Sequence, residues 1–385
     1  MVNYKIATLK NPYRCLEIEG FPVNSAAMQI TLPQWYDFHV HLRQGGPMKA
    51  YVAAHLAMGC AGVLAMPNTR PPVGKVFEAD SLPYWSIENY RQMINDAGGD
   101  KFSALIVPLY LTKDTTPKMI EDGVRAGLLT SCKYYPPHGT TNSDHGRPLQ
   151  SFIDNGVFRA MEENGAILNI HGEEHALSGE AYFGKNSNAE DFFYRERMPS
   201  LREKFPDLKI VCEHITTGTA AGFVAQAGGR TGATITPQHL LYTMGDLVQG
   251  FKYHLYCLPL VKFEEDRATL LNAVRNPGNT QFFAGTDSAP HTAKATECGC
   301  AAGCFTGGIA PQLYAEAFDL NKGHEEFKSF LCLNGPKFYN LPVPEKNFTL
   351  VREEQPMTAL QTEDGTVTPL PLGLGRNSLP WKIAA

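Results

Sequence analysis

The sequence has little that would tie the protein to a membrane, to nucleic acid or to an export route. No apolar run approaches the roughly 18 residues that a membrane-spanning helix needs. The net charge of −5 gives no basic excess for binding nucleic acid or an anionic membrane. Residues 1–20 mix basic side chains with Glu17 and Glu19 and contain no continuous apolar segment. We therefore expect no secretory signal and no nucleic-acid or membrane partner.

A disulfide framework is also missing. The nine cysteines are an odd number, whereas small secreted domains carry even, regularly spaced sets. Five of the nine lie in apolar surroundings: Cys60, Cys132, Cys212, Cys257 and Cys332. We expect these five to be buried, reduced thiols in a cytoplasmic protein.

The chain lacks a glycine-rich phosphate loop after an early strand, which disfavours an open doubly wound sheet. What it has is a regular alternation. Eight short β-rich runs end in polar, glycine or proline residues: 35–41, 62–68, 102–111, 131–136, 166–173, 209–216, 233–241 and 281–288. Stretches with helical spacing separate them, at 48–58, 81–97, 116–126, 149–164, 217–227 and 263–274. Eight strands joined by crossover helices predict an α/β fold, a closed (β/α)8 TIM barrel.

One barrel domain with terminal additions is the simplest organisation. We expect residues 1–34 to be an N-terminal extension, with a few edge strands packed on the outside. The barrel would span residues 35–340, including helices near 310–318 and 325–339. Residues 341–385 are rich in proline, and we expect them to fold back onto the barrel and the N-terminal extension.

His39 and His41 give the first indication of chemistry. Residues two apart on a strand point to the same side, so both imidazoles would share one face, and Arg43 follows with the same parity. Two imidazoles beside a guanidinium suggest a metal with an anion held next to it. For this pattern alone, a strand with two hydrogen-bonded histidines is an equal alternative.

Further metal-ligand and acid–base residue types recur at the carboxyl ends of other strands, where βα barrels carry their active sites. They are Asn68, Lys133, His171, His214 and Asp287, with His291 on the last loop. Each has an ordinary explanation on its own, such as a hydrogen-bonded histidine, a snorkelling lysine or an aspartate in a turn. Those explanations would have to hold independently at strand after strand, so we interpret the residues as one site.

Four histidines, an aspartate and a lysine can hold two zinc-like ions, since imidazole and carboxylate suit zinc. An ammonium would repel the metals, so Lys133 would have to react with CO₂ and bridge them as a carbamate. Burial lowers a lysine pKa and gives the free amine for that reaction. Water shared by two metals becomes a nucleophile near neutral pH, and Asp287 could exchange protons with it.

These segments resemble the dihydroorotase family of the amidohydrolase superfamily, in particular its shorter monofunctional members from bacteria and fungi. The matching segments run along nearly the whole barrel: 37–43, 65–68, 133–136, 140–143, 170–173, 213–217, 234–239, 254–259, 285–291, 298–300 and 334–336. The resemblance implies the reversible, zinc-dependent cyclisation of N-carbamoyl-L-aspartate to L-dihydroorotate, the third step of pyrimidine synthesis. It also implies two Zn²⁺ per chain and favours a homodimer.

The resemblance further implies residue roles. The metal ligands would be His39 and His41 with Asp287 at the first ion, His171 and His214 at the second, and N6-carboxylysine at Lys133 bridging both. Asp287 would also be the general acid and base. Substrate contacts would come from His41, Arg43, Asn68, Thr140, Thr141, His171, Leu258, His291 and an alanine after Cys300. Both Ala301 and Ala302 stand where bacterial members have one alanine, so either could make that contact. Residues 137–145 match a loop that closes over substrate.

Two other functions are open on sequence grounds. The first is another cyclic-amide hydrolase, such as a hydantoinase, dihydropyrimidinase or allantoinase, but those substrates need no Arg43 for a ring carboxylate. The second is an inactive barrel acting as a scaffold, which should have lost ligands that this chain keeps. Cys298, Cys300 and Cys304 are interpreted as a tight loop rather than a metal site. His239 and His254 are interpreted as structural.

Overall fold

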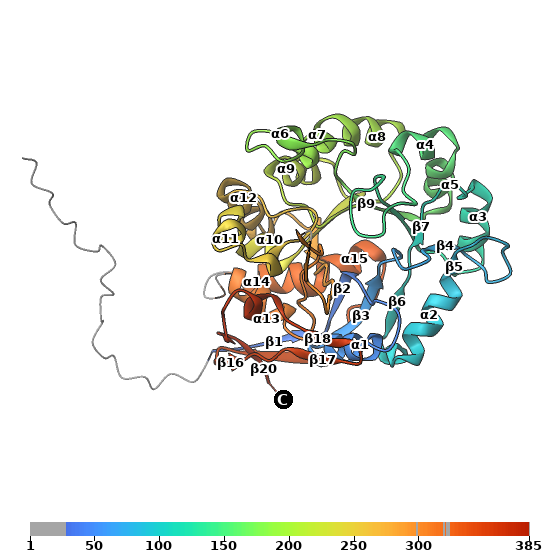
Figure 1. Ribbon diagram of the computed structural model, residues 1–385. Helices are drawn as coiled ribbons and strands as arrows, with labels where there is room; N and C mark the ends of the chain where they lie inside the picture. Colours follow the sequence, from blue (N-terminus) through green and yellow to red (C-terminus); the bar gives the residue numbers. More distant parts are fainter. Residues whose placement is uncertain (1–27, 298, 319, 321–323, 385) are drawn as a thin grey trace, which may run out of the picture.

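The computed structural model describes residues 28–297, 299–318, 320 and 324–384. Most of the expected N-terminal extension, residues 1–27, and Cys298 lie outside the described residues. The strands of the barrel lie around the centre of the molecule (Figure 1). They are β2 (Trp35–Val40), β3 (Cys60–Ala65), β6 (Ala104–Ile106) continued by β7 (Leu109–Tyr110), β8 (Ser131–Tyr134), β9 (Ile167–His171), β10 (Ile210–Glu213), β11 (Thr231–Ile235) and β12 (Phe282–Ala284).

Neighbouring barrel strands pair in parallel, as the alternation with helices predicts. In the β8–β9–β10 ladder, Cys132 lies opposite Leu168 and Cys212 opposite Ile170. The barrel closes where the segment after β12 returns to β2. There the Asp287 N–H donates to the His39 carbonyl at 2.9 Å. This closure places the end of the last strand against the first pair of histidines.

Two expected strands differ from those observed. The run 102–111 is two strands, because Pro108 has no N–H to donate to the ladder. The run 233–241 is strand only to Ile235 and then becomes α10 (Pro237–Leu241). Thr236 caps that helix, its hydroxyl accepting from the His239 N–H at 3.2 Å, and proline at the first helical position suits a helix start.

Helices surround the barrel (Figure 1). Those at the expected positions are α1 (Met48–Ala57), α2 (Ile87–Asp96), α3 (Pro117–Arg125), α4 (Leu149–Asp154), α5 (Val157–Asn164), α9 (Gly218–Gln226) and α12 (Glu264–Arg275). The stretch 149–164 divides into two helices, since Gly156 adopts φ +79° between them. Shorter helical pieces are α6 (Gly179–Tyr182), α7 (Ala189–Phe192), η2 (Phe193–Arg197), α8 (Met198–Lys204), α11 (Met244–Val248) and η3 (Tyr253–Leu255). After the barrel come α13 (Ala310–Ala317), α14 (His324–Lys328), η4 (Ser329–Leu333) and α15 (Asn334–Tyr339).

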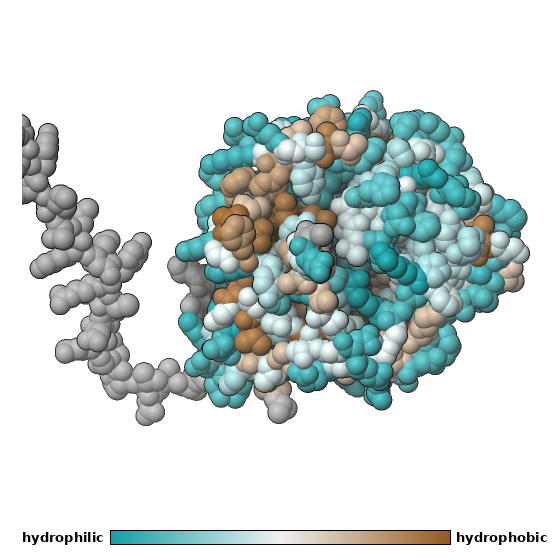
Figure 2. Space-filling view, in the orientation of Figure 1, coloured by the Kyte–Doolittle hydropathy of each residue, from teal (hydrophilic) through white to brown (hydrophobic). Residues whose placement is uncertain are grey.

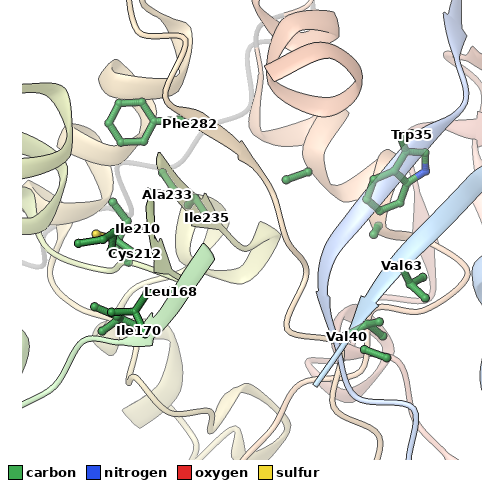
Figure 3. Packing of buried hydrophobic residues seen from close by; sticks show 14 of the residues in the cluster. Trp35, Val40, Val63, Leu168, Ile170, Ile210, Cys212, Ala233, Ile235 and Phe282 are labelled. Carbon is green, nitrogen blue, oxygen red and sulfur yellow. The ribbon is translucent and has the colours of Figure 1, made fainter. Parts of the chain in front are cut away.

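The barrel strands have apolar residues on both faces. Leu168, Ile170, Ile210 and Cys212 belong to the large core cluster shared with the helices (Figure 3). A second cluster contains the alternate residues of the same strands, such as Ile167 and Val211, together with Phe338 and Tyr339 of α15. The other inward-facing members of this cluster include Tyr36, Phe38, Leu64, Met66 and Phe283. Burying one such side chain contributes about 1.5–3 kcal/mol.

The inward-facing set turns polar toward the carboxyl ends of the strands. On β9, Ile167 is followed at alternate positions by Asn169 and His171, and on β10 Val211 is followed by Glu213. The Asn169 amide connects the apolar and the polar part of this inward-facing set. It donates to the Tyr339 hydroxyl at 2.8 Å and to the Glu213 carboxylate at 3.0 Å. The barrel is therefore apolar at one end and carries its buried polar residues at the other.

The two ends of the described chain meet in a small sheet. β1 (Gln29–Pro33) pairs antiparallel with β15 (Asn347–Val351), which also pairs with β20 (Lys382–Ile383). The extended piece expected at 348–352 is thus β15. The remaining short elements of this region are β16 (Gln355–Pro356), β17 (Leu360–Thr362), β18 (Gly365–Val367), α16 (Leu370–Gly373) and β19 (Ser378–Leu379).

The surface is largely hydrophilic on the face drawn in Figure 2, with brown side chains gathered over α11. Val248, Phe251 and Tyr253 are exposed large hydrophobic residues in this part of the chain. Among the helices that the structure describes, none has both the length and the hydropathy to cross a bilayer. The five cysteines expected to be buried thiols are buried and free.

Candidate metal centre and substrate pocket

His39, His41 and Asp287 converge at the carboxyl end of the barrel. Asp287 Oδ1 lies 3.3 Å from His39 Nε2 and 3.0 Å from His41 Nε2. One ligand atom from each of the three residues lies within 4.8 Å of the others, as in a metal site. Asp287 has φ +49°, a conformation that non-glycine residues rarely adopt and that is typical of functional sites. The closure of β12 against β2 thus creates a three-ligand cluster.

His214 and His171 stand next to this cluster. The His214 ring centroid lies 4.9 Å from that of His39 and 4.8 Å from that of His171. His214 also has positive φ, +40°, and its N–H donates to the Thr234 hydroxyl at 2.8 Å. Its Nδ1 is buried and has no hydrogen-bond partner within the described part of the chain. An unpartnered buried nitrogen beside other ligand atoms fits metal coordination.

Lys133 lies fully buried below the histidines on β8. Its ammonium contacts Glu213 of β10 and lies 4.6 Å from the centroid of the Tyr135 ring. Burial lowers the pKa of Lys133 well below its ordinary value, because water does not reach the charge. Glu213 had no predicted role, yet His39, His214 and Glu213 also form a possible ligand group.

The electrostatics of the cluster favour metal-binding protonation states. Burial lowers the pKa of His41 to about 4 and that of His214 well below its ordinary value, so both imidazoles are neutral at pH 7. Burial alone would raise the pKa of Asp287, but hydrogen bonds from His39 and His41 hold that pKa well below its usual value. Neutral imidazoles and a carboxylate are ligand forms that zinc binds.

Glu173 orients His171. Its Oε2 lies 2.8 Å from His171 Nε2, which leaves the other ring nitrogen for a ligand. A carboxylate that accepts from a metal-ligating histidine fixes the ring and its tautomer. The His-Gly-Glu spacing of two residues on one strand could have indicated this pair from sequence.

We expect Glu173→Gln to weaken metal binding by about 10- to 100-fold, because the amide holds the imidazole less firmly. The measurement is zinc retained after dialysis against a competing chelator. Glu174→Gln is the matched control, since Glu174 points instead to Arg197, with Oε2 2.7 Å from its Nε. Equal zinc loss in both variants would contradict the role of Glu173.

A pocket opens above the cluster. His39, His41, His171, His214 and Asp287 form its floor, and its walls include Arg43, Asn68, Tyr135, Thr140, Thr141, Leu258 and Ala302. Ala302 lines the pocket, whereas Ala301 is not among the lining residues. His291 is not among the lining residues either. It lies behind Arg43 and Ala302, with its Nε2 3.0 Å from the Arg43 guanidinium and 2.8 Å from the Ala302 carbonyl.

The loop 137–145 is attached to the pocket through Asn68. The Asn68 amide donates to the Thr141 carbonyl at 2.9 Å, and the Asn142 amide donates to the Asn68 carbonyl at 2.9 Å. These bonds place Thr140 and Thr141 over the pocket. The structure thus brings the expected loop, the cluster and Arg43 to one place.

The residues interpreted as structural lie outside the pocket lining. His239 is held by the Thr236 hydroxyl at 2.7 Å and the Pro259 carbonyl at 3.1 Å. Cys304 donates to the His254 carbonyl. Neither Cys300 nor Cys304 belongs to a ligand group among the described residues.

Comparison with known proteins decides the family. No protein-family model matches the chain. The dihydroorotase of Pseudomonas fluorescens (strain SBW25) is 40% identical over 360 residues, covering 92% of this chain and 98% of the relative. The chain belongs to the dihydroorotase family. The dihydroorotase of Halorhodospira halophila is 39% identical with the same coverage.

Solved structures agree with this assignment. A Saccharomyces cerevisiae dihydroorotase in complex with 5-fluoroorotic acid matches with a TM-score of 0.81 and 26% identity, covering 92% of this chain and 98% of that one. The dihydroorotase of Campylobacter jejuni gives 0.80 and 26%, with coverage of 94% and 99%. A Thermus D-hydantoinase shares the fold at a TM-score of 0.70 and 13% identity, covering 92% of this chain and 82% of that one.

The expected function and fold are therefore confirmed. The chain is a (β/α)8 barrel enzyme with dihydroorotase activity, a metal-dependent hydrolase of the amidohydrolase type that acts on a small molecule. The hydantoinase alternative rests on likeness of fold alone. The scaffold alternative is not favoured, because all six expected ligand residues are present.

Proposed function

We propose that the site holds two zinc ions, with the ligand set implied by the resemblance. His39, His41 and Asp287 would bind one ion, His171 and His214 the other, and Lys133 would bridge both as N6-carboxylysine. The observation that carries the proposal is the approach of His39 and His41 to one oxygen of Asp287. The buried Lys133 supports it, because its lowered pKa favours the free amine that reacts with CO₂.

When bound, two zinc ions polarise the attacked carbonyl and lower the pKa of water toward about 7. Asp287 would move the proton: it takes a proton from the attacking water and returns it to the leaving ring nitrogen. During cyclisation Asp287 would transfer the proton in the opposite direction. The loop 137–145, which contributes Thr140 and Thr141 to the pocket lining, would close over the bound substrate.

Substrate would be held by its carboxylate. Arg43 offers a planar fork of N–H donors that matches a carboxylate, and Asn68 lies on the same wall. His291 orients the guanidinium from behind. Thr140 and Thr141 would contact the substrate from the loop, and His41 and His171 would contact it from the floor of the pocket. The backbone of Leu258 and Ala302 would contact the edge of the substrate ring. Ala302 is our choice over Ala301 because only Ala302 lines the pocket.

The acid-binding role is consistent with the ligand of the yeast structure. That relative was solved with 5-fluoroorotic acid, a pyrimidine ring that bears one carboxylate. We expect this chain to bind orotate-like acids in the same pocket. Dihydroorotate hydrolysis by the purified protein, measured beside its zinc content, tests the whole proposal; inactive protein with two bound zinc ions would contradict it.

The direction of the reaction should depend on pH. The open form carries two carboxylates and the ring one, so cyclisation takes up a proton. At equilibrium, the ratio of N-carbamoyl-L-aspartate to dihydroorotate should rise about tenfold per pH unit near neutrality. Chromatography of equilibrated mixtures between about pH 6 and pH 8 measures it. A ratio that does not change with pH would contradict the proposed reaction.

We also propose that the enzyme works as a homodimer in the cytoplasm. Residues 35–340 would be the catalytic barrel, with residues 1–34 and 341–385 as extensions packed on it. The sheet of β1, β15 and β20 supports the association of the two extensions. Sedimentation of the purified protein tests the oligomeric state.

A further inference from the structure

Lys294 lies beside the pocket and has no part in the proposed metal or carboxylate sites. It precedes two short antiparallel strands, β13 (Ala295–Thr296) and β14 (Gly299–Cys300). The β13 residues are exposed, but the Lys294 side chain is buried, with 7% of its surface exposed. A lysine at the base of an exposed hairpin would ordinarily extend into solvent.

The Lys294 ammonium donates to three backbone carbonyls. The distances are 2.7 Å to Tyr256, 2.5 Å to Ala301 and 2.5 Å to Gly303. An ammonium has three N–H donors, so all of them are used.

These carbonyls belong to the wall of the substrate pocket. Ala301 and Gly303 flank Ala302, which lines the pocket, and Tyr256 lies two residues before Leu258, which lines it too. The Gly303 N–H also donates to the Tyr256 carbonyl at 3.0 Å. Lys294 therefore links the segments 256–258 and 301–303, whose backbone would contact the substrate ring.

Lys294 lies close to the carboxylate side of the pocket. It holds the carbonyls on either side of Ala302, whose own carbonyl lies 2.8 Å from His291 Nε2. Within the part of the chain that the structure describes, Lys294 forms no ion pair and is solvated by the three carbonyls. Burial lowers the pKa of His291 to about 3, and the charges of Arg43 and Lys294 act in the same direction. In a poorly hydrated wall a charge acts over several ångströms.

We propose that Lys294 is a positioning and specificity residue for acidic substrates. It holds Leu258 and Ala302 in place, and its charge adds to that of Arg43 in attracting the substrate carboxylate. Because the open substrate carries two negative charges and the ring one, the effect is larger for N-carbamoyl-L-aspartate than for dihydroorotate. This inference rests on the proposed function.

The test compares three variants of the zinc-loaded enzyme. Lys294→Gln removes the charge but keeps two N–H donors. Lys294→Met removes the charge and the N–H donors, and Lys294→Arg keeps the charge and N–H donors. For Lys294→Gln we expect KM to rise roughly tenfold for dihydroorotate and several times more for N-carbamoyl-L-aspartate, with kcat within about threefold. Lys294→Arg should keep the wild-type ratio of the two KM values.

The matched control is Lys75→Gln. Lys75 is also a buried lysine that donates to loop carbonyls, those of Glu78 at 3.0 Å and Asp80 at 3.1 Å, and it is absent from the pocket lining. Its replacement should leave the ratio of the two KM values unchanged. Equal KM changes for both substrates in Lys294→Gln would reduce Lys294 to a structural role and overturn the inference.

Two further measurements test the inference: the KM ratio of Lys294→Arg and the affinity for orotate. If the glutamine variant does not fold, a KM ratio altered in Lys294→Arg would still overturn the inference. Calorimetric binding of orotate to zinc-loaded protein separates this inference from the proposed function. Inactive wild-type protein whose orotate affinity falls roughly tenfold in Lys294→Gln would reject the function and keep the role of Lys294. Unchanged orotate affinity would reject that role.

Discussion

Lys133→Ala should lower kcat for dihydroorotate hydrolysis by roughly 10³-fold or more, and it should reduce bound zinc from two ions per chain to one or none. The reason is that Lys133 is fully buried on β8, and its carbamate would supply the anion shared by the two proposed ions. Without this anion, the two positive ions would share a site that has lost one negative charge. Elemental analysis and a steady-state assay give the two quantities.

The alanine variant also leaves Glu213 without its lysine partner, so a loss of stability has to be separated from a loss of metal. Lys209→Ala is the control, since Lys209 donates to the Phe338 carbonyl at the opposite end of the barrel. That variant should keep both zinc ions. Added acetate should restore part of the activity of Lys133→Ala, because a small carboxylate can occupy the space of the carbamate. Wild-type zinc content and turnover in Lys133→Ala would refute the bridging role.

The second large effect is expected for Arg43→Met. KM for dihydroorotate should rise by roughly 100-fold, as expected for losing a charge-assisted, bidentate contact to a carboxylate. An uncharged ring such as dihydrouracil should bind within about threefold of its wild-type affinity. The guanidinium lines the pocket and is fixed by the Pro290 carbonyl at 2.7 Å and by His291 at 3.0 Å, so little freedom is lost on binding.

The comparison of charged and uncharged rings decides the interpretation. Arg125→Met is the control, since Arg125 is exposed on α3 and pairs with Asp122. It should change neither affinity. If Arg43→Met weakened both rings equally, the side chain would shape the pocket rather than recognise the acid, and a preference for uncharged cyclic amides would be favoured. For Arg43→Lys, KM for dihydroorotate should lie between the values of the wild type and Arg43→Met, because an ammonium keeps the charge but not the planar fork of donors.

Local sequence patterns carried much of the fold and of the site. Alternation of β-rich and helical runs indicated the barrel, and parity along β2 placed His39 and His41 on one face, where both now lie next to Asp287. The apolar run at 233–241 was assigned wrongly as one strand, because a short apolar run does not distinguish strand from helix. The Thr236–Pro237 start of α10 was the available signal.

What the sequence determined by itself is the set of residues at the strand ends, since each follows from a local run and its period. What only the tertiary structure decided is which of them meet: Glu213 against Lys133 across the intervening strand β9, and Lys294 against carbonyls of two separate loops. The physical reason is that periodicity fixes the face on which a side chain lies. Its neighbours across a barrel depend on register, strand stagger and closure, which involve the whole chain at once.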